Sequence, residues 1–276
     1  MAQSFKRSLL VRGLEGWGAI WLSTMAIIGG VWYLLRDVAM WIMRAATHKR
    51  VRFGHAALVT QMARVGVRSV GIVMLVCGCV GVILALQMEP PLADFGQTDK
   101  IANIIGVAIF RELGPLISAI VLTGFAGASI AAEIGTMVVG EEIEALEAHA
   151  LNPIRFLVVP RVLATTIALI LLTGIGDLAA VAGGGFMTVT FLDVPYELYK
   201  SNTLSQLKPH DFLSGLIKAS VFGVIISGLA CFHGLHVTGG AAGVGRATTS
   251  TVVHSLVAII IADLMFTLIF FAIGWT

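Results

Sequence analysis

The fold of this chain is decided by residues 69–88, SVGIVMLVCGCVGVILALQM, a stretch without a single charged residue. A helix of about 20 apolar residues crosses the roughly 30 Å hydrocarbon core of a bilayer. Four further apolar runs follow it, at residues 101–132, 156–192, 212–237 and 252–275. The sequence therefore predicts an all-α integral membrane protein with five transmembrane helices. The third run is too long for one simple crossing, so we expect its far end to be irregular or tilted.

The composition supports this class. Of the 276 residues, 57% are hydrophobic and 12% are charged, whereas a soluble domain has about 25% charged residues. The mean hydropathy is +0.93 and the formal net charge is +2. A soluble fold with so few polar residues could not cover its surface. These values exclude a disordered chain, a nucleic-acid-binding protein and an ordinary soluble enzyme.

The N-terminal stretch 16–35 is apolar but ambiguous. It is uncharged and contains Trp17, Trp21 and Trp32, and basic residues flank it on both sides. A crossing helix carries its positive excess on one side, whereas a helix lying in the membrane interface tolerates both. We therefore expect an N-terminal interfacial segment over residues 1–52 and a transmembrane domain over residues 53–276. A sixth span is the alternative.

Basic residues predict the orientation. The segment 44–68 carries six Lys or Arg residues and no acid, which assigns it to the cytoplasm. The acidic loop 89–94 then lies outside, the loop 140–161 inside, and the segment 193–210, with room for a short helix, outside. The loop 238–251, with its glycine-rich run, returns inside and is expected to be flexible. The N-terminus is thus cytoplasmic and the C-terminus lies outside.

Five charged residues fall within or near the apolar runs: Arg111, Glu112, Asp177, Lys218 and Asp263. A bare charge at the bilayer centre costs about 2.5–3.5 kcal/mol on insertion scales, so each should face a partner, a cavity or another helix. Lys218 and Asp263 could pair and fix helix packing.

Arg111 and Glu112 stand directly before Leu113-Gly114-Pro115. Because a Gly-Pro pair weakens helix continuity, we expect a helix break beside a charged pair. Such a pair in mid-membrane favours a polar-lined cavity, with a purely structural role as the alternative.

The most polar stretch is GEEIEALEAHALNP, residues 140–153. Ala, Leu and Glu are strong helix formers, and Asn152-Pro153 would end the helix. Ile143, Leu146 and Ala150 would share one face. The segment is either a solvated surface helix or a short amphipathic helix presented to a cytoplasmic partner.

No stretch of the sequence has the spacing of a catalytic site. The phosphate-binding pattern G-x-x-x-x-G-K-[ST] is absent, so we expect ATP to be hydrolysed by another subunit. Cys231, His233 and His236 are weak evidence for a metal, and we expect none. The sequence predicts a transporter subunit rather than an enzyme. Two alternatives stay open, an intramembrane enzyme and an ion-coupled carrier with Asp177, Lys218 and Asp263 as a proton relay.

Several motifs in order resemble the MlaE/YrbE permease family. They are RELGP at 111–115, AAEIGTM at 131–137, the acidic stretch 141–147, NPIRFLVVPR at 152–161 and GRATTSTVVHS at 245–255. The resemblance runs from about residue 53 to the end of the chain.

The resemblance implies a permease subunit of an ABC transporter that moves phospholipid or a related lipid between the inner and outer membranes of bacteria. It implies an interfacial helix, five spans and a homodimer in the inner membrane. The implied partners are ATPase subunits, which hold ATP and magnesium, and a periplasmic ring of MCE-domain proteins. The chain itself needs no cofactor.

The resemblance also implies site residues. Leu84, Gln87 and Glu112 match positions near the lipid cavity, which Arg111 would also line. Lys218 and Asp263 match charged positions in the last two spans. The coupling helix that docks on the ATPase would present Glu141, Glu142, Ile143, Glu144, Leu146 and Glu147. The chain departs from the family at Ala150, where Gly is frequent, and at Phe125, where Arg is common.

Overall fold

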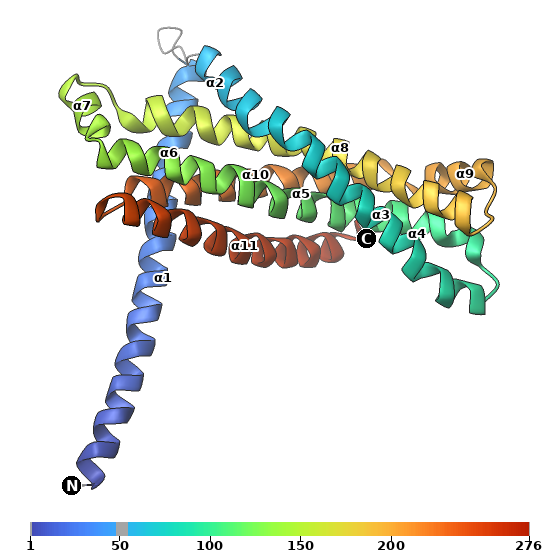
Figure 1. The fold of residues 1–276 in the computed structure, drawn as a ribbon, viewed down its shortest axis with the longest axis horizontal. Helices are drawn as coiled ribbons and strands as arrows, with labels where there is room; N and C mark the ends of the chain where they lie inside the picture. The colour runs from blue at the N-terminus through green and yellow to red at the C-terminus, as the bar shows by residue number, and fades with distance from the viewer. Residues whose placement is uncertain (1, 48–54, 276) are drawn as a thin grey trace. The chain divides into compact units, whose positions relative to one another are not determined.

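The structure is a computed structural model that describes residues 2–47 and 55–275. Within those ranges every regular element is helical, which confirms the all-α prediction (Figure 1). In chain order the elements are α1 (Ala2–Thr47), α2 (His55–Met62), η1 (Ala63–Val67), α3 (Arg68–Asp94), η2 (Thr98–Lys100), α4 (Ile101–Ala108), η3 (Ile109–Leu113), α5 (Gly114–Leu122), η4 (Thr123–Gly127), α6 (Ala128–Val139), α7 (Glu142–Ala148), η5 (Ile154–Val158), α8 (Val159–Phe191), α9 (Tyr196–Gln206), α10 (Pro209–Leu235) and α11 (Gly240–Ile273).

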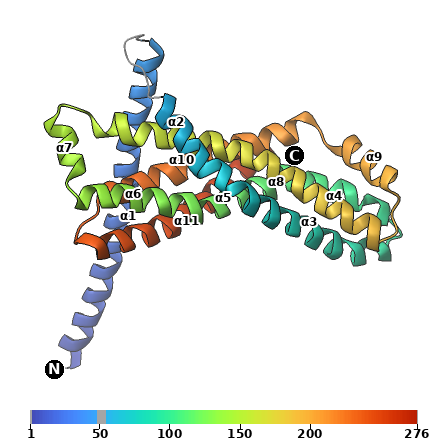
Figure 2. The same cartoon turned by 45° about the horizontal axis from the view of Figure 1, so that its top comes forward.

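The chain divides into two compact units, Met1–Val51 and Arg52–Thr276. The first contains α1, and the second contains all the other helices. In the second unit α7 and α9 lie at opposite ends of the helical bundle (Figures 1 and 2).

Six helical stretches are long and apolar enough to cross a membrane. They are Trp21–Ala45, Ala56–Asp94, Ile101–Val139, Ile154–Phe191, Pro209–Leu235 and Gly240–Ile273. The last five correspond to the five predicted spans. Trp21–Ala45 meets the same criteria of length and composition, so its interfacial position stays a prediction.

The predicted helix break at Gly114-Pro115 is wrong. The π-helical turn η3 joins α4 to α5 without interruption, and a second π-turn, η4, joins α5 to α6. Pro115 directly follows the π-turn in this continuous helix, and a local π adjustment of this kind accommodates a proline within a membrane helix. The wider π-turn absorbs the irregularity that the sequence suggested, and such turns are frequent at functional sites.

The predicted loop 89–94 is also wrong, because α3 continues through Pro90 and Pro91 to Asp94. The helix is closed one residue later by a Schellman cap. In that cap the Gln97 N–H donates to Leu92 O at 2.8 Å, and Gly96 adopts a φ of +63°.

One further expectation fails at the start of a long helix, because the glycine-rich run starts α11 at Gly240 rather than forming a flexible loop. The far end of the third span was expected to be irregular or tilted. Helix α8 stays regular to Phe191, and the tilt stays a prediction. Glycine costs a helix only about 1 kcal/mol per residue, whereas backbone groups left unpaired in lipid cost several. The short helix expected after Asp193 is confirmed as α9.

Helix α8 is the centre of the bundle, and α3 crosses it at backbone distance. A Cβ atom on Gly81 would lie 1.8 Å from Ala180 O, and one on Gly183 would lie 2.3 Å from Gly78 O. Small residues allow this approach. The tight crossing fixes the frame on which α10 and α11 carry their charged side chains.

Candidate functional site

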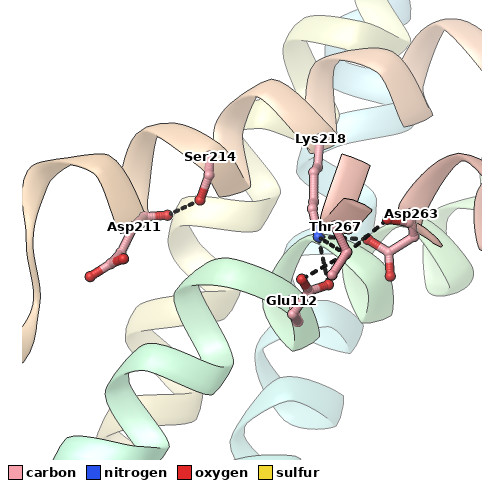
Figure 3. Close-up of polar contacts among 6 residues, drawn as sticks. All are labelled: Glu112, Asp211, Ser214, Lys218, Asp263 and Thr267. Carbon is pink, nitrogen blue, oxygen red and sulfur yellow. Dashed lines mark hydrogen bonds and ion pairs between the residues drawn. The ribbon is translucent and has the colours of Figure 1, made fainter. Parts of the chain in front are cut away.

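A cluster of charged side chains joins three of the spans (Figure 3). Lys218 of α10 donates from Nζ to Glu112 Oε2 at 2.5 Å. Its Nζ also lies 2.9 Å from Asp263 Oδ1 of α11, as an ion pair without hydrogen-bond geometry. The pairing of Lys218 with Asp263 considered from the sequence is thus found, and Glu112 joins it.

Thr267, one helical turn after Asp263, completes the cluster. Its hydroxyl accepts a hydrogen bond from Lys218 Nζ at 3.2 Å and lies 2.9 Å from Glu112 Oε1, to which it donates. The sequence analysis missed this residue. Its spacing of four from Asp263 puts both on one helix face, which was the available signal.

The cluster is asymmetric in its access to the surroundings. The Lys218 side chain is 1% exposed and that of Asp263 is 16% exposed, whereas the Glu112 side chain is 38% exposed. Two carboxylates and one ammonium carry a formal charge of −1. Glu112 is therefore the group through which this cluster can meet a ligand.

Arg111, adjacent to Glu112 on η3, is used differently. Its Nε donates to Asp211 Oδ1 at 2.5 Å. Asp211 is fully buried, and its second carboxylate oxygen accepts the Lys208 N–H at 2.9 Å in a capping box that starts α10. Arg111 thus ties the π-turn to the start of α10, and Asp211 is a partner that the sequence analysis did not name.

Asp177 lies apart from this cluster, in the middle of α8. It is 1% exposed, and its Oδ1 has no hydrogen-bond partner among the described residues. A Cβ atom on Gly114 would lie 1.6 Å from that oxygen. The carboxyl group therefore rests against the backbone that follows the π-turn, rather than in a chain with Lys218 and Asp263.

Leu84 and Gln87 lie on α3. Leu84 is half-buried and packs against the apolar core, while Gln87 is exposed. No contact joins either residue to the Glu112 cluster within the described part of this single chain.

The acidic helix α7 lies between α6 and η5. Glu141, Glu142, Glu144 and Glu147 are exposed, whereas Ile143 and Leu146 are half-buried. Leu146 lines a hollow of about 450 Å³ with Met137 of α6 and Leu157 of η5. Leu146 thus faces an open hollow between α7 and its neighbouring helices, and the exposed glutamates make the rest of the α7 surface acidic.

The end of α7 differs from the expectation. Ala150 lies outside the helix with a φ of +57°, in a Schellman cap where the Leu151 N–H donates to Leu146 O at 3.0 Å. Asn152 does not end α7. Its side-chain oxygen instead accepts the Arg155 N–H at 3.1 Å, at the start of η5.

Comparison with known proteins assigns these helices to a family. The sequence profile of the family described as Permease MlaE matches residues 58–269. The chain belongs to the MlaE permease family. It is therefore a multi-pass membrane permease of the ABC transporter type. The matched range contains Glu112, Lys218, Asp263 and Thr267, and all of α1 lies outside it.

Curated relatives of this MlaE permease cover most of its length. A probable ABC transporter permease protein of Rickettsia prowazekii is 40% identical over 216 residues, which are 78% of this chain and 83% of that protein. The intermembrane phospholipid transport system permease protein MlaE of Haemophilus influenzae is 31% identical over 82% of this chain and 87% of its own. The chloroplastic protein trigalactosyldiacylglycerol 1 of Arabidopsis thaliana is 36% identical over 76% of this chain and 60% of its own.

A second ionic network of this MlaE permease lies at the same end as α7. Glu133 of α6 accepts a hydrogen bond from Arg64 Nη1 of η1 at 2.6 Å and pairs with Arg161 Nη2 of α8 at 3.2 Å. Arg161 is buried, and its Nη1 donates to Leu157 O at 2.8 Å. Glu133 thus connects the two helices that carry α7 with the start of the first span.

His233 of α10 and His254 of α11 form a further polar contact between spans, with ring nitrogens 2.9 Å apart. The described residues contain no group of three or more His, Cys, Asp or Glu side chains arranged to hold a metal ion. Cys231, which the sequence analysis weighed with His233 and His236, is buried.

Proposed function

We propose that this chain is the permease subunit of an ABC transporter that moves phospholipid, or a related lipid, between the inner and outer membranes. The observation that carries the proposal is the family match over residues 58–269, together with the Haemophilus influenzae relative named for intermembrane phospholipid transport. The chain would be a homodimer in the bacterial inner membrane, with its N-terminus in the cytoplasm and its C-terminus in the periplasm. Periplasmic MCE-domain proteins would form a ring on it.

The charged cluster supports a lipid substrate. A phospholipid needs an apolar cavity for its chains and a few polar groups for its headgroup. Glu112 supplies an accessible charge inside an otherwise apolar bundle. Leu84, Gln87 and Arg111 would line the same cavity once a second copy closes it. The outer face of α11 is suited to that contact, because Ile260, Leu264 and Leu268 are all exposed on it.

The acidic helix supports an external motor. A chain without a phosphate-binding loop needs an ATPase subunit, which would hold ATP and magnesium. Glu141, Glu142, Glu144 and Glu147 leave a negative surface for that partner. Ile143 and Leu146 would belong to the same docking surface, so that a movement of the partner reaches α6 and α8 through α7. Residues 1–52 would remain an interfacial segment.

Two measurements test the proposal on the purified complex. A co-expressed ABC ATPase subunit should be retained by the tagged chain and lost in the variant Glu144→Lys/Glu147→Lys. The control Glu197→Lys changes an exposed carboxylate on α9 and should leave retention unchanged. Equal retention in both variants would contradict docking on α7.

The second measurement is mass spectrometry of the bound lipid. Wild-type protein should carry phospholipid, and Glu112→Gln should carry at least severalfold less while the ATPase is still retained. The conservative change keeps one acceptor oxygen for Lys218 and removes the accessible charge, while the new amide nitrogen can no longer accept the hydrogen bond from Thr267. If Glu112→Gln carried as much phospholipid as the wild-type protein, the assignment of Glu112 to the lipid cavity would be wrong.

A further inference from the structure

The C-terminal half of α8 and the helix α9 enclose a groove that none of the functions above uses. It has a volume of about 580 Å³, within the range of about 300–1,000 Å³ for small-molecule sites. Its apolar walls include Leu178, Phe186 and Leu204, each of which is more than 60% exposed. The groove lies at the end of the bundle away from α7 (Figures 1 and 2).

The Tyr199 side chain of α9 forms the floor of the groove by packing against α8. The Tyr199 hydroxyl donates to Val181 O at 2.9 Å, and the ring lies so close to Gly185 that a Cβ atom there would be 2.8 Å from it. Burial raises the pKa of Tyr199 to about 12, so the phenol stays neutral. The contact holds α9 against α8, and the groove is a fixed feature of the fold.

One end of the groove is basic. Lys200 lines it, and no ion pair within the described residues includes this ammonium group. Thr190 and Tyr196 belong to the same lining, whose residues include no Asp or Glu. Asp193 and Glu197 are near in sequence but do not line it.

These features match one chemical class of ligand. A lipid chain fills an exposed apolar groove, and the ammonium of a lysine on its lining binds a phosphate through charge-assisted hydrogen bonds. Lys and Tyr are the residues that reach headgroups at the end of a span. A helix from a partner protein would fill the apolar walls and leave Lys200 without an anion.

We propose that the α8–α9 groove binds one glycerophospholipid of the bilayer, with an acyl chain along Leu178 and Phe186 and the phosphate on Lys200. The site is separate from the Glu112 cluster. It does not rest on the proposed transport, because a bilayer lipid can bind there whether or not it is carried.

Photolabelling in nanodiscs tests this site on the full-length protein. The probe is phosphatidylglycerol with a diazirine in one acyl chain, and labelled peptides are identified by mass spectrometry. Labelling should fall on residues 178–204. A diacylglycerol with the same diazirine chain should label this segment several times less, because it lacks the phosphate.

Matched lysine variants test the charge. Lys200→Glu should reduce phosphatidylglycerol labelling about fivefold, the effect of one partly exposed charge contact of about 1 kcal/mol. Lys100→Glu makes the same change at an exposed lysine outside the groove and should have no effect. Ala182→Trp, whose side chain would fill the groove, should abolish labelling of the segment. If Lys200→Glu fails to fold, Lys200→Met tests the loss of the charge in its place.

Three outcomes would overturn the proposal. They are equal labelling by the two probes, equal labelling of Lys200→Glu and Lys100→Glu, and protection of the segment by a co-purified protein helix. Glu112→Gln should leave groove labelling intact. A variant that loses groove labelling but transports lipid normally would show that this site is separate from the proposed function. A variant that loses transport but keeps groove labelling would show the same.

Discussion

Replacing Lys218 with methionine is the sharpest perturbation of the charged cluster. Methionine has nearly the length of lysine without the charge, and the wild-type side chain is 1% exposed. In Lys218→Met the carboxylates of Glu112 and Asp263 face each other across an apolar side chain. Breaking a buried ion pair on one side costs about 3–5 kcal/mol, because a charge is left without its partner.

The structure favours the lower end of that range. Glu112 is 38% exposed and can be solvated after the change, whereas Asp263 is 16% exposed and cannot turn fully away. We therefore expect the free energy of unfolding to fall by about 3 kcal/mol, with most of the loss assigned to Asp263. The double variant Lys218→Met/Asp263→Leu should recover part of this loss, because it removes both members of the more buried pair.

The assay is reversible unfolding of the purified protein in mixed micelles, followed by circular dichroism. Lys100→Met serves as the control, because Lys100 is exposed on η2 and surface changes usually stay within about 0.5 kcal/mol. A loss below 1 kcal/mol in Lys218→Met would refute the reasoning. A double variant less stable than the single one would refute it as well.

Three further changes test the packing and caps in the same assay. Ala150→Gly should stabilise the protein by about 1 kcal/mol, because Ala150 has a strained φ of +57°. Gly96→Ala should destabilise the protein by a similar amount, because Gly96 occupies an equivalent position with a φ of +63°. If the two variants were equally stable, the strain argument would be refuted. Gly183→Ala should cost about 1–3 kcal/mol, since its Cβ would lie 2.3 Å from Gly78 O, and Gly174→Ala on the same helix, with open space around it, should be neutral or stabilising. Glu133→Gln should cost about 1–3 kcal/mol by leaving buried Arg161 without its charged partner, and an unchanged midpoint would show that the network is dispensable.

The spans could be predicted because crossing a lipid bilayer requires an uncharged stretch of sufficient length. That property can be recognised from the local sequence alone. The short helix α9 and the helical character of residues 142–148 follow from local patterns in the same way. The π-turn at residues 109–113 could not be predicted, because Gly114-Pro115 weakens a helix in any setting. Only packing against α8 and α10 decides that the chain continues.

The members of the charged cluster were predicted as charges in need of partners, but only Lys218 and Asp263 were matched. Glu112 is 106 residues from Lys218, and no local rule connects them. Arg111 illustrates the opposite error. Because Arg111 is adjacent to Glu112 in sequence, we expected both side chains to lie in the same cavity. On a helix, however, adjacent side chains point in different directions, and Arg111 pairs with Asp211 instead.

The acidic segment shows why an amphipathic pattern does not name its partner. The spacing of Ile143 and Leu146 predicted an apolar face, but the pattern is silent on whether that face meets another protein or the chain itself. The hollow that Leu146 lines with Met137 and Leu157 is open, so a partner's side chain could fill it as well. The glutamates of α7 are exposed in either case.

The central claim is that ATP hydrolysis by a separate subunit drives lipid movement through this permease. The most direct measurement is transfer of fluorescent phospholipid by the complex in proteoliposomes, with ATP or with an imposed ion gradient as the energy source. The account predicts transfer with ATP and magnesium, none with the gradient alone, and strong reduction in Glu112→Gln. Transfer by the permease alone on an ion gradient would contradict it and favour the ion-coupled carrier.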